Sequence, residues 1–134
     1  MPLYNTKFEQ PIGYVEEFVT RSQFTDGGST AGTYQLKSAV PVGAYVLNTV
    51  LTELVGFTGD TSATITVGDG SDVDRYNTGT PSVYTTANQL AMGVPSGTKE
   101  HTAAVFPTLT VTSNADFTSV TAGAFRIKIV YIKG

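Results

Sequence analysis

Beyond Tyr14, the chain is a succession of short runs of β-branched and aromatic residues, each closed by a turn signal that contains glycine, aspartate, asparagine or proline. Such signals occur at residues 26–28, 59–60, 68–70 and 122–123, and this punctuation is typical of short strands. No stretch of about 11 residues places apolar side chains at the spacing of an amphipathic helix. The pattern predicts an all-β fold: a single-domain antiparallel β-sandwich, jelly-roll-like, with about eight strands.

The run at the C-terminal end of the sequence shows the clearest two-residue alternation. One of its faces is apolar throughout and is expected in the core; its members are Phe125, Ile127, Ile129 and Tyr131. The other face begins with two basic residues and ends with Val130 and Ile132, which we expect to meet a partner surface. Further strands are expected within residues 14–25, 33–37, 63–67 and 108–112.

Three segments depart from simple alternation. Residues 43–57 carry apolar side chains on both faces, which indicates one long strand or two strands joined at a bulge, between two covered surfaces. Residues 86–92 are the one place where a short helical turn is expected. Residues 1–13 show no periodicity and contain Pro2, Pro11 and Gly13. They are therefore predicted to form an extended N-terminal arm, ahead of a β-sandwich domain of residues 14–134.

Composition narrows the functions that such a domain can serve. The net charge is −3, and an acidic chain binds nucleic acid poorly because phosphates require a basic surface. The lack of cysteine and the single histidine exclude thiolate and multi-histidine metal sites, so no cofactor is expected. No stretch is long and apolar enough to cross a membrane. Charged residues make up only 14% of the chain, against about a quarter in typical domains, and this predicts large buried interfaces.

One loop carries clustered carboxylates. Asp69, Asp72 and Asp74 lie within a glycine-containing segment, and carboxylate oxygens are the ligands that Ca²⁺ prefers. The spacing differs from that of an EF-hand loop, which requires a glutamate at its twelfth position. The favoured interpretation is turn chemistry, in which Asp72 or Asp74 pairs with Arg75 or accepts hydrogen bonds from backbone amides.

The residues that catalysis would need are not arranged for it. His101 lacks the nucleophile and orienting acid of a triad, and no Gly-x-Ser-x-Gly sequence is present, so it is interpreted as an exposed loop histidine. Glu16, Glu17 and Glu53 are candidates for the carboxylate pair of a glycosidase. Glu16 and Glu17 are adjacent, however, and point to opposite faces of a strand. We therefore expect no enzymatic activity.

Residues 53–76 carry a more specific pattern. A glutamate and a Gly-Phe-Thr-Gly step lead into a threonine-rich run, then Val-Gly-Asp at residues 67–69 and Asp-Arg-Tyr at residues 74–76. This order resembles small all-β virion proteins of tailed bacteriophages, in which the first step reads Glu-x-Phe-x-Gly; here Gly56 falls within that step. The Ala-Gly turn at residues 122–123, followed by a strand that ends in Val130-Tyr131, is also similar.

The resemblance implies a jelly roll or related β-sandwich that forms a homotrimer on the outer surface of a phage capsid, as a decoration (cement) protein. Such a chain is a structural, non-enzymatic virion protein that binds the major capsid protein and stabilises the shell by bridging its subunits. We expect the partner contacts at six apolar residues of the arm and the last strand: Leu3, Tyr4, Phe8, Ile12, Val130 and Ile132.

Two other hypotheses stay open at this point. Phage tail proteins share such patterns, so the chain is alternatively a tail or cell-surface β-sandwich module that recognises a receptor or a glycan. An aromatic-lined groove near Tyr76 and Tyr84 would favour this alternative. The third hypothesis is a hydrolase on the same fold, which requires two carboxylates at a catalytic separation.

Overall fold

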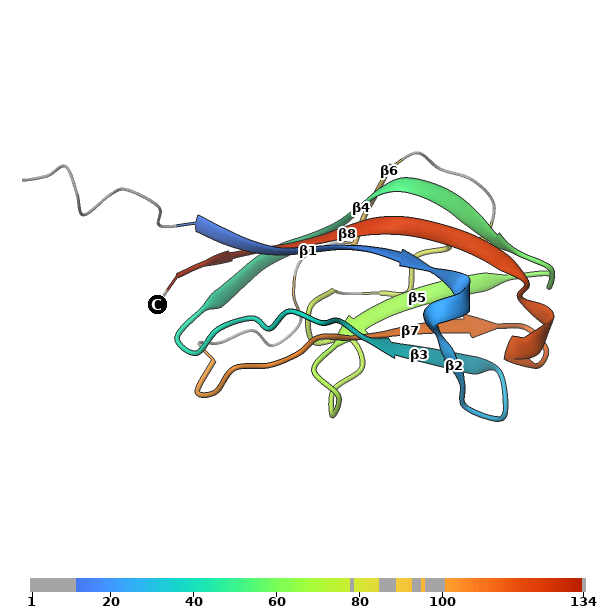
Figure 1. Cartoon of the computed structure of the whole chain (residues 1–134), viewed down its shortest axis with the longest axis horizontal. Helices are drawn as coiled ribbons and strands as arrows, with labels where there is room; N and C mark the ends of the chain where they lie inside the picture. The colour runs from blue at the N-terminus through green and yellow to red at the C-terminus, as the bar shows by residue number, and fades with distance from the viewer. Residues whose placement is uncertain (1–11, 78, 85–88, 93–94, 96–100, 134) are drawn as a thin grey trace, which may run out of the picture.

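The computed structural model describes residues 12–77, 79–84, 89–92, 95 and 101–133, which form two antiparallel sheets packed face to face (Figure 1). Sheet A has the order β1-β8-β4-β6, that is Ile12–Thr20, Ala122–Ile132, Tyr45–Thr58 and Gln89–Ala91. Sheet B has the order β2-β3-β7-β5, that is Thr25–Asp26, Ala31–Gln35, Thr108–Ser113 and Ala63–Gly68. Two 3₁₀ turns, η2 (Arg21–Gln23) and η3 (Phe117–Ser119), connect strands. The predicted antiparallel β-sandwich is confirmed.

The chain crosses repeatedly between the two sheets. Beyond β5, the Ile65 amide donates to the Pro81 carbonyl at 3.0 Å and the Val83 amide donates to the Ala63 carbonyl at 2.9 Å. Residues 81–83 therefore extend sheet B beside β5. We now set aside the short β2 and count residues 81–83 as a strand of sheet B. In chain order the strands then belong to sheets A, B, A, B, B, A, B and A. This interleaving is that of a jelly roll.

The predicted alternation matches the core. Phe125, Ile127 and Ile129 of β8 are fully buried, while Tyr131 is half-buried and packs against the core. The inward residues of the sheet B strands β5 and β7 are also fully buried: Ala63, Ile65, Val67, Leu109 and Val111. Each buried valine, leucine, isoleucine or phenylalanine among them contributes roughly 1.5–3 kcal/mol through removal from water, so these two-residue patterns fix which face of each strand points inward.

The longest strand, β4, is continuous but irregular. Its pairing with β8 shifts register between Val46 and Asn48 and on either side of Val55, and Glu53 adopts a φ of 53°. This confirms one long strand interrupted by bulges. Only its inner face is covered, however: Leu47 and Val55 are exposed on the other side. The expectation that both faces are covered is therefore wrong for the chain in isolation.

The short helical turn expected within residues 86–92 is also wrong in the described part of that segment. Residues Gln89–Ala91 form β6, which pairs antiparallel with residues 50–52 of β4. The Met92 amide continues the pairing by donating to the Thr49 carbonyl at 3.0 Å. An available strand edge overrides weak local helix propensity here.

Two glycines allow aromatic rings to lie directly against backbone. A Cβ at Gly32 would overlap the Phe117 ring, and a Cβ at Gly123 would overlap the Phe57 ring. Gly123 also has a φ of +147°, a region that glycine enters at little cost. The close approach lets Phe57 reach Phe24 and Phe125, with ring centres 5.8 and 5.6 Å away.

Candidate interaction face

The outer face of sheet A, on the side away from sheet B, carries most of the large apolar side chains that the described residues expose. They are between 37% and 60% exposed, and their strands hydrogen-bond to one another. The set consists of Ile12, Tyr14, Phe18, Tyr45, Leu47, Val55 and Ile132. Monomeric proteins rarely gather so many exposed apolar residues in one contiguous patch, and such patches mark interaction sites.

Strand register divides this face into two halves. Ile12 of β1 lies opposite Ile132 of β8, which lies opposite Tyr45 of β4; Tyr14 lies opposite Val130 in the same way. We call the uncharged region near the start of β1 the apolar half; it consists of Ile12, Tyr14, Tyr45, Leu47, Val130 and Ile132. Lys128 marks its boundary, with its Nζ 4.7 Å from the centre of the Tyr14 ring.

The other region, which we call the charged half, consists of Glu16, Phe18, Glu53 and Arg126. The Arg126 Nε donates to a Glu53 carboxylate oxygen at 2.8 Å, and a second guanidinium nitrogen lies 3.8 Å from Glu16. Glu53 raises the pKa of Arg126 further by accepting this hydrogen bond. The guanidinium also lies 5.5 Å from the centre of the Phe18 ring. Arg126 is thus paired within the face, and the two glutamates leave the charged half with one excess negative charge.

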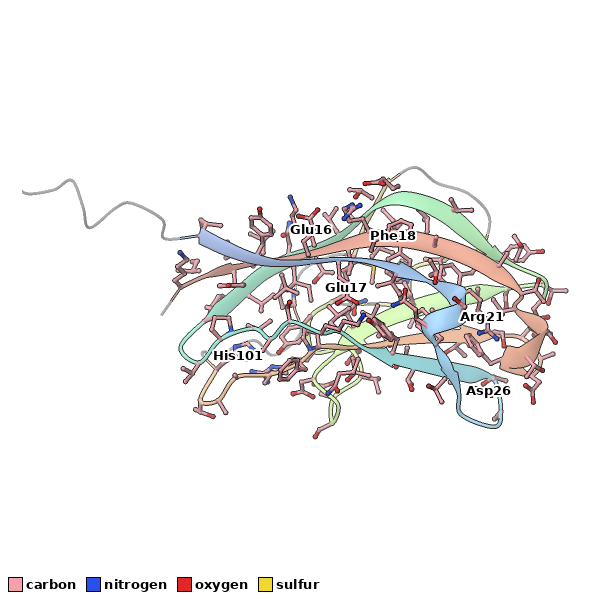
Figure 2. The ribbon with its side chains drawn as sticks, in the orientation of Figure 1. Glu16, Glu17, Phe18, Arg21, Asp26 and His101 are labelled. Atoms are coloured by element: carbon pink, nitrogen blue, oxygen red, sulfur yellow. The ribbon has the colours of Figure 1, made fainter. Side chains whose placement is uncertain are left out.

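The opposite end of the sandwich is polar. Asp60 accepts hydrogen bonds from the amides of Thr61, Asn114 and Ala115 at 2.6–2.8 Å, and these bonds lower its pKa. Asp116 accepts from the Thr118 amide at 3.0 Å. Figure 2 shows Arg21 and Asp26 at this same end, away from His101. Asp60 and Asp116 thus lie at the end of the strands away from the apolar half.

The structure places three of the six predicted partner residues together, since Ile12, Val130 and Ile132 all lie in the apolar half. Leu3, Tyr4 and Phe8 lie outside the described residues. Ile12, which the sequence assigned to the arm, is already paired in β1.

Sequence reasoning missed Tyr14, Tyr45 and Leu47 as members of this surface. Tyr14 could have been found, because it follows Ile12 at two-residue spacing. Tyr45 and Leu47 could not, because a bulge decides which way their part of β4 faces.

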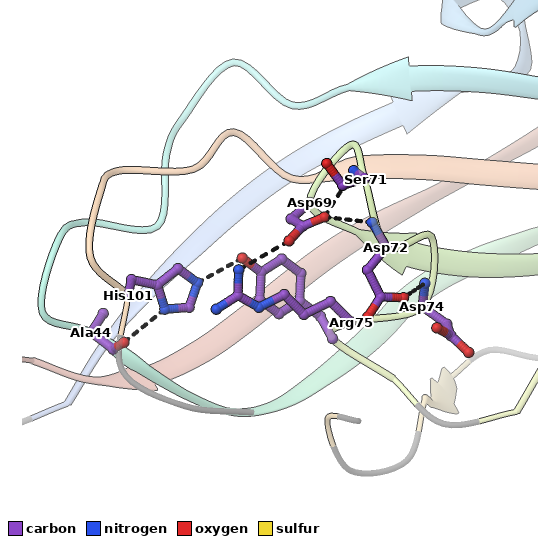
Figure 3. Close-up of polar contacts among 8 residues, drawn as sticks. Ala44, Asp69, Ser71, Asp72, Asp74, Arg75 and His101 are labelled. Atoms are coloured by element: carbon purple, nitrogen blue, oxygen red, sulfur yellow. Dashed lines mark hydrogen bonds and ion pairs between the residues drawn. The ribbon is translucent and has the colours of Figure 1, made fainter. Parts of the chain in front are cut away.

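The carboxylates of Asp69 and Asp72, in the loop after β5, accept hydrogen bonds from groups of the same loop (Figure 3). Asp69 accepts from the amides of Ser71 and Asp72 at 2.9 and 2.7 Å and from the Arg75 guanidinium at 3.0 Å. Burial alone would raise the pKa of Asp69, but these donors together hold it below its usual value. Asp72 accepts from the Asp74 amide at 3.4 Å.

The predicted capping by Asp72 is confirmed. The predicted pairing of Arg75 with Asp72 or Asp74 is wrong, because the partner is Asp69. Within the described parts of the chain, no three acidic, histidine or cysteine side chains are grouped to hold a metal ion.

The prediction of an exposed His101 is wrong, because the side chain is buried. Its Nδ1 lies 2.7 Å from the Ala44 carbonyl oxygen and its Nε2 lies 2.6 Å from the Tyr76 hydroxyl (Figure 3). A carbonyl can only accept, so Nδ1 carries the proton and Nε2 accepts from Tyr76. Burial lowers the pKa of His101 and raises that of Tyr76 to about 12. Through these two hydrogen bonds the neutral His101 side chain links Ala44, just before β4, to Tyr76 in the loop after β5.

The three glutamates that were candidates for a catalytic pair each contact other groups in the structure. Glu16 and Glu17 point to opposite faces of β1, as predicted (Figure 2). Glu17 lies at the edge between the sheets, where it accepts from the Tyr34 hydroxyl and from the Lys37 amide. Burial and Glu17 together raise the pKa of Tyr34 to about 12. Glu16 and Glu53 instead flank Arg126, so the three carboxylates serve structural contacts.

Two further observations bear on the other hypotheses. Tyr76 is fully buried and Tyr84 is half-buried against the core, so these residues do not line the aromatic groove that a glycan-binding module would need. Among the residues that the structure describes, no helix is long and apolar enough to cross a membrane.

No family model matches the chain, and no curated protein matches it. Among solved structures, a chain in the capsid asymmetric unit of cyanophage Pam1 is similar, with 19% identity, a TM-score of 0.56 and full coverage of both chains. A chain in the capsid of Helicobacter pylori bacteriophage KHP30 has 14% identity and a TM-score of 0.47, covering 88% of this chain and 93% of that one.

A low-affinity xylan-binding module, CBM86, from Roseburia intestinalis has 11% identity and a TM-score of 0.43, with coverages of 86% and 94%. The match to the Pam1 chain shows a shared fold over the whole length. It confirms the expected likeness to a protein from a phage capsid.

Proposed function

We propose that this chain is a structural, non-enzymatic virion protein that binds the outer surface of a phage capsid as a decoration (cement) protein. In this role it binds the major capsid protein, associates as a homotrimer and stabilises the shell by bridging capsid subunits. The six predicted residues, Leu3, Tyr4, Phe8, Ile12, Val130 and Ile132, make the partner contacts. The division into an arm of residues 1–13 and a domain of residues 14–134 stays part of this proposal.

The observation that carries the proposal is the exposed apolar half of sheet A. Its rigid strands present Ile12, Tyr14, Tyr45 and Ile132 to solvent without an intervening charge. Burial of apolar surface is the main driving force for association. A surface of this kind fits a permanent protein partner better than a small polar ligand, which would need convergent hydrogen-bonding groups.

The fold supports the same role. The jelly roll shared with the Pam1 chain covers the full length of both compared chains, and that chain belongs to a phage capsid structure. The polar end with Asp26, Asp60 and Asp116 is suited to face solvent while the apolar end is covered.

Shell stabilisation follows from simple mass action. A protein that binds assembled capsid but not separated subunits favours the assembled state by its binding free energy. When three linked copies bind neighbouring subunits together, each additional contact forms at a high effective concentration. Modest contacts by Ile12, Val130 and Ile132 on each copy then suffice for a long-lived complex.

The test uses phage heads assembled without this chain and the purified full-length protein. We expect saturable binding when heads are sedimented and bound protein is quantified, and loss of binding when residues 1–12 are deleted. The Val73→Asp variant is the matched control, because Val73 is exposed on the loop after β5 and outside sheet A. Unchanged occupancy after the deletion would contradict the role of the arm, and failure of the full chain to bind would contradict the function.

The alternative is a receptor- or glycan-binding module of a phage tail or cell surface. The exposed Tyr14 and Tyr45 rings are the features that such a module could use, since aromatic faces are common in ligand sites. Glycan-array binding that is lost on Tyr45→Ala, together with no binding to heads, would favour this alternative over the capsid role.

A further inference from the structure

One of the sheet edges in the described part of the chain is much longer than the others. Sheet A ends at β1 on one side and at the three-residue β6 on the other. Sheet B ends at the two-residue β2 and at residues 81–83 beside β5. Short edge strands offer an incoming strand little to pair with. In contrast, β1 has nine residues and lies at the margin of sheet A (Figure 1).

The edge strand β1 lacks the proline and the bulge that commonly block pairing. Its register with β8 runs through nine consecutive positions without a shift, and it contains no proline. Among the described residues, the backbone hydrogen bonds use only the side of β1 that faces β8. On the side towards sheet B, Glu17 accepts from Tyr34 and from the Lys37 amide, which fixes the position of the strand. A regular, exposed edge of this length is a template for pairing with another chain.

The backbone groups that face this open edge can be identified. The amide of Thr20 donates to the Gln23 side chain at 2.8 Å and not to β8. In an antiparallel pair, residues that bond to the partner strand alternate with residues that face away from it. The amides and carbonyls of Tyr14, Glu16 and Phe18, at two-residue spacing from Thr20, therefore face the open edge.

The pairing further inside sheet A gives the same alternation. The Thr49 carbonyl accepts from the Met92 amide, so Thr49 faces away from β8. Its opposite residue, Ile129, therefore faces β1 and bonds to Val15. Val15 bonds to β8, and the residues on either side of it do not.

The outward side chains of β1 define what an added strand must carry. Figure 2 shows Glu16 and Phe18 on the outer side of β1, and the exposed Tyr14 lies two positions before Glu16. The Glu16 carboxylate lies 3.8 Å from Arg126, whose Nε donates to Glu53. The excess negative charge of the charged half thus lies beside the open edge, between two aromatic residues.

We propose that an extended segment of the major capsid protein adds to the open edge of β1 as a further strand of sheet A. The segment bonds to the outward amides and carbonyls of β1. A lysine or arginine of the segment lies opposite Glu16, and apolar residues lie opposite Tyr14 and Phe18. This pattern holds for either strand direction, because Glu16 has an aromatic residue two positions away on each side.

The inference rests on the proposed function and assigns the chemistry of the capsid partner. An added strand continues the outer face of sheet A, so the apolar half stays part of the same capsid contact. Backbone hydrogen bonds supply affinity in such strand additions, and the alternate side chains supply specificity.

Two substitutions at one position separate the backbone contribution from that of the side chain. Glu16→Ala removes the carboxylate, whereas Glu16→Pro also removes the outward amide; proline is tolerated at edge positions whose amide faces solvent. Binding to heads assembled without this chain is measured by sedimentation. Glu16→Pro is expected to bind about tenfold more weakly than Glu16→Ala. Equal binding by the two variants, both folded by circular dichroism, would overturn the inference.

Charge reversal tests the basic residue of the partner. Glu16→Lys is expected to weaken head binding more than Glu16→Ala, because it opposes a cation in addition to removing the carboxylate. Asp74→Lys makes the same charge change on the loop after β5, outside sheet A, and is expected to bind as the wild type does. If Glu16→Lys binds as well as Glu16→Ala, no basic residue lies opposite Glu16 and the inference is wrong.

Cryo-electron microscopy of heads with bound wild-type protein does not depend on the folding of any variant. The expected result is strand density about 4.8 Å from β1 that traces to a capsid subunit. Bound protein with no strand beside β1 refutes the strand addition but leaves the capsid role standing. A strand that traces to residues 1–11 or to another copy of this chain also overturns the inference. Failure of the wild type to bind heads at all refutes the capsid role, and the inference with it.

Discussion

Replacing Tyr76 with phenylalanine removes one hydroxyl from the interior of the sandwich and leaves its volume almost unchanged. The hydroxyl is the only donor that the structure places on the Nε2 of His101, at 2.6 Å among the described residues. Both side chains are buried, so water does not readily replace the lost partner. The Nδ1 of His101 stays bound to the Ala44 carbonyl, which prevents the ring from turning towards another donor.

The expected cost follows from the group that is left unsatisfied. A buried acceptor that loses its partner typically costs about 1–3 kcal/mol. For a domain of this size, each kcal/mol lowers the melting temperature by about 3–5 °C, so we expect the variant to melt roughly 3–15 °C below the wild type. The ring stacking between Tyr76 and His101, with centres 5.7 Å apart, is retained in the phenylalanine variant and does not add to the loss.

Urea unfolding at pH 7.5, followed by fluorescence and circular dichroism, measures this difference directly. Tyr14→Phe is the matched control, because the Tyr14 hydroxyl is removed from an exposed ring and should change stability by less than about 0.5 kcal/mol. If Tyr76→Phe and Tyr14→Phe unfold at the same urea concentration as the wild type, the buried hydrogen bond to His101 does not contribute as described.

Three further predictions concern stability. Because burial lowers the pKa of His101 below its ordinary value of 6.5, the unfolded chain binds the proton more readily. Wild-type stability should therefore fall as the pH drops below 6.5, and His101→Gln should remove that slope in urea titrations. Gly123→Ala should cost about 1–3 kcal/mol because its Cβ overlaps Phe57, whereas Gly28→Ala, which also has a positive φ but open space around its Cβ, should cost less by the same assay. Asp60→Asn should lower the urea midpoint at pH 7, and the difference from wild type should vanish below the lowered pKa of Asp60; an unchanged midpoint would contradict the role of its three amide bonds.

The regular strands could be predicted from sequence because their cause is local. In β8 every second residue points to the same face. Because Arg126 and Lys128 occupy the solvent-facing side, the apolar Phe125, Ile127 and Ile129 must point inward. The same rule placed Ile132 on the outer face. What could not be predicted is whether that outer face is covered, because coverage depends on strands that are distant in sequence and on other molecules.

The errors have non-local causes as well. His101 follows a loop-like segment in sequence, and only the fold brings it to Tyr76 and Ala44, 25 and 57 residues away. The partner of Arg75 depended on the geometry of a turn, which directs the Asp69 carboxylate towards it. Pairing with β4 produced a strand at Gln89–Ala91 where local pattern suggested a helical turn.

The central claim is that this chain covers the outside of a phage capsid. Cryo-electron microscopy of heads assembled without the chain, imaged before and after addition of the purified protein, tests it directly. We expect new density on the outer surface at junctions between capsid subunits, with the volume of three sandwiches at each occupied position. Heads that show no added density, or protein that decorates only the tail, would contradict a role on the capsid surface.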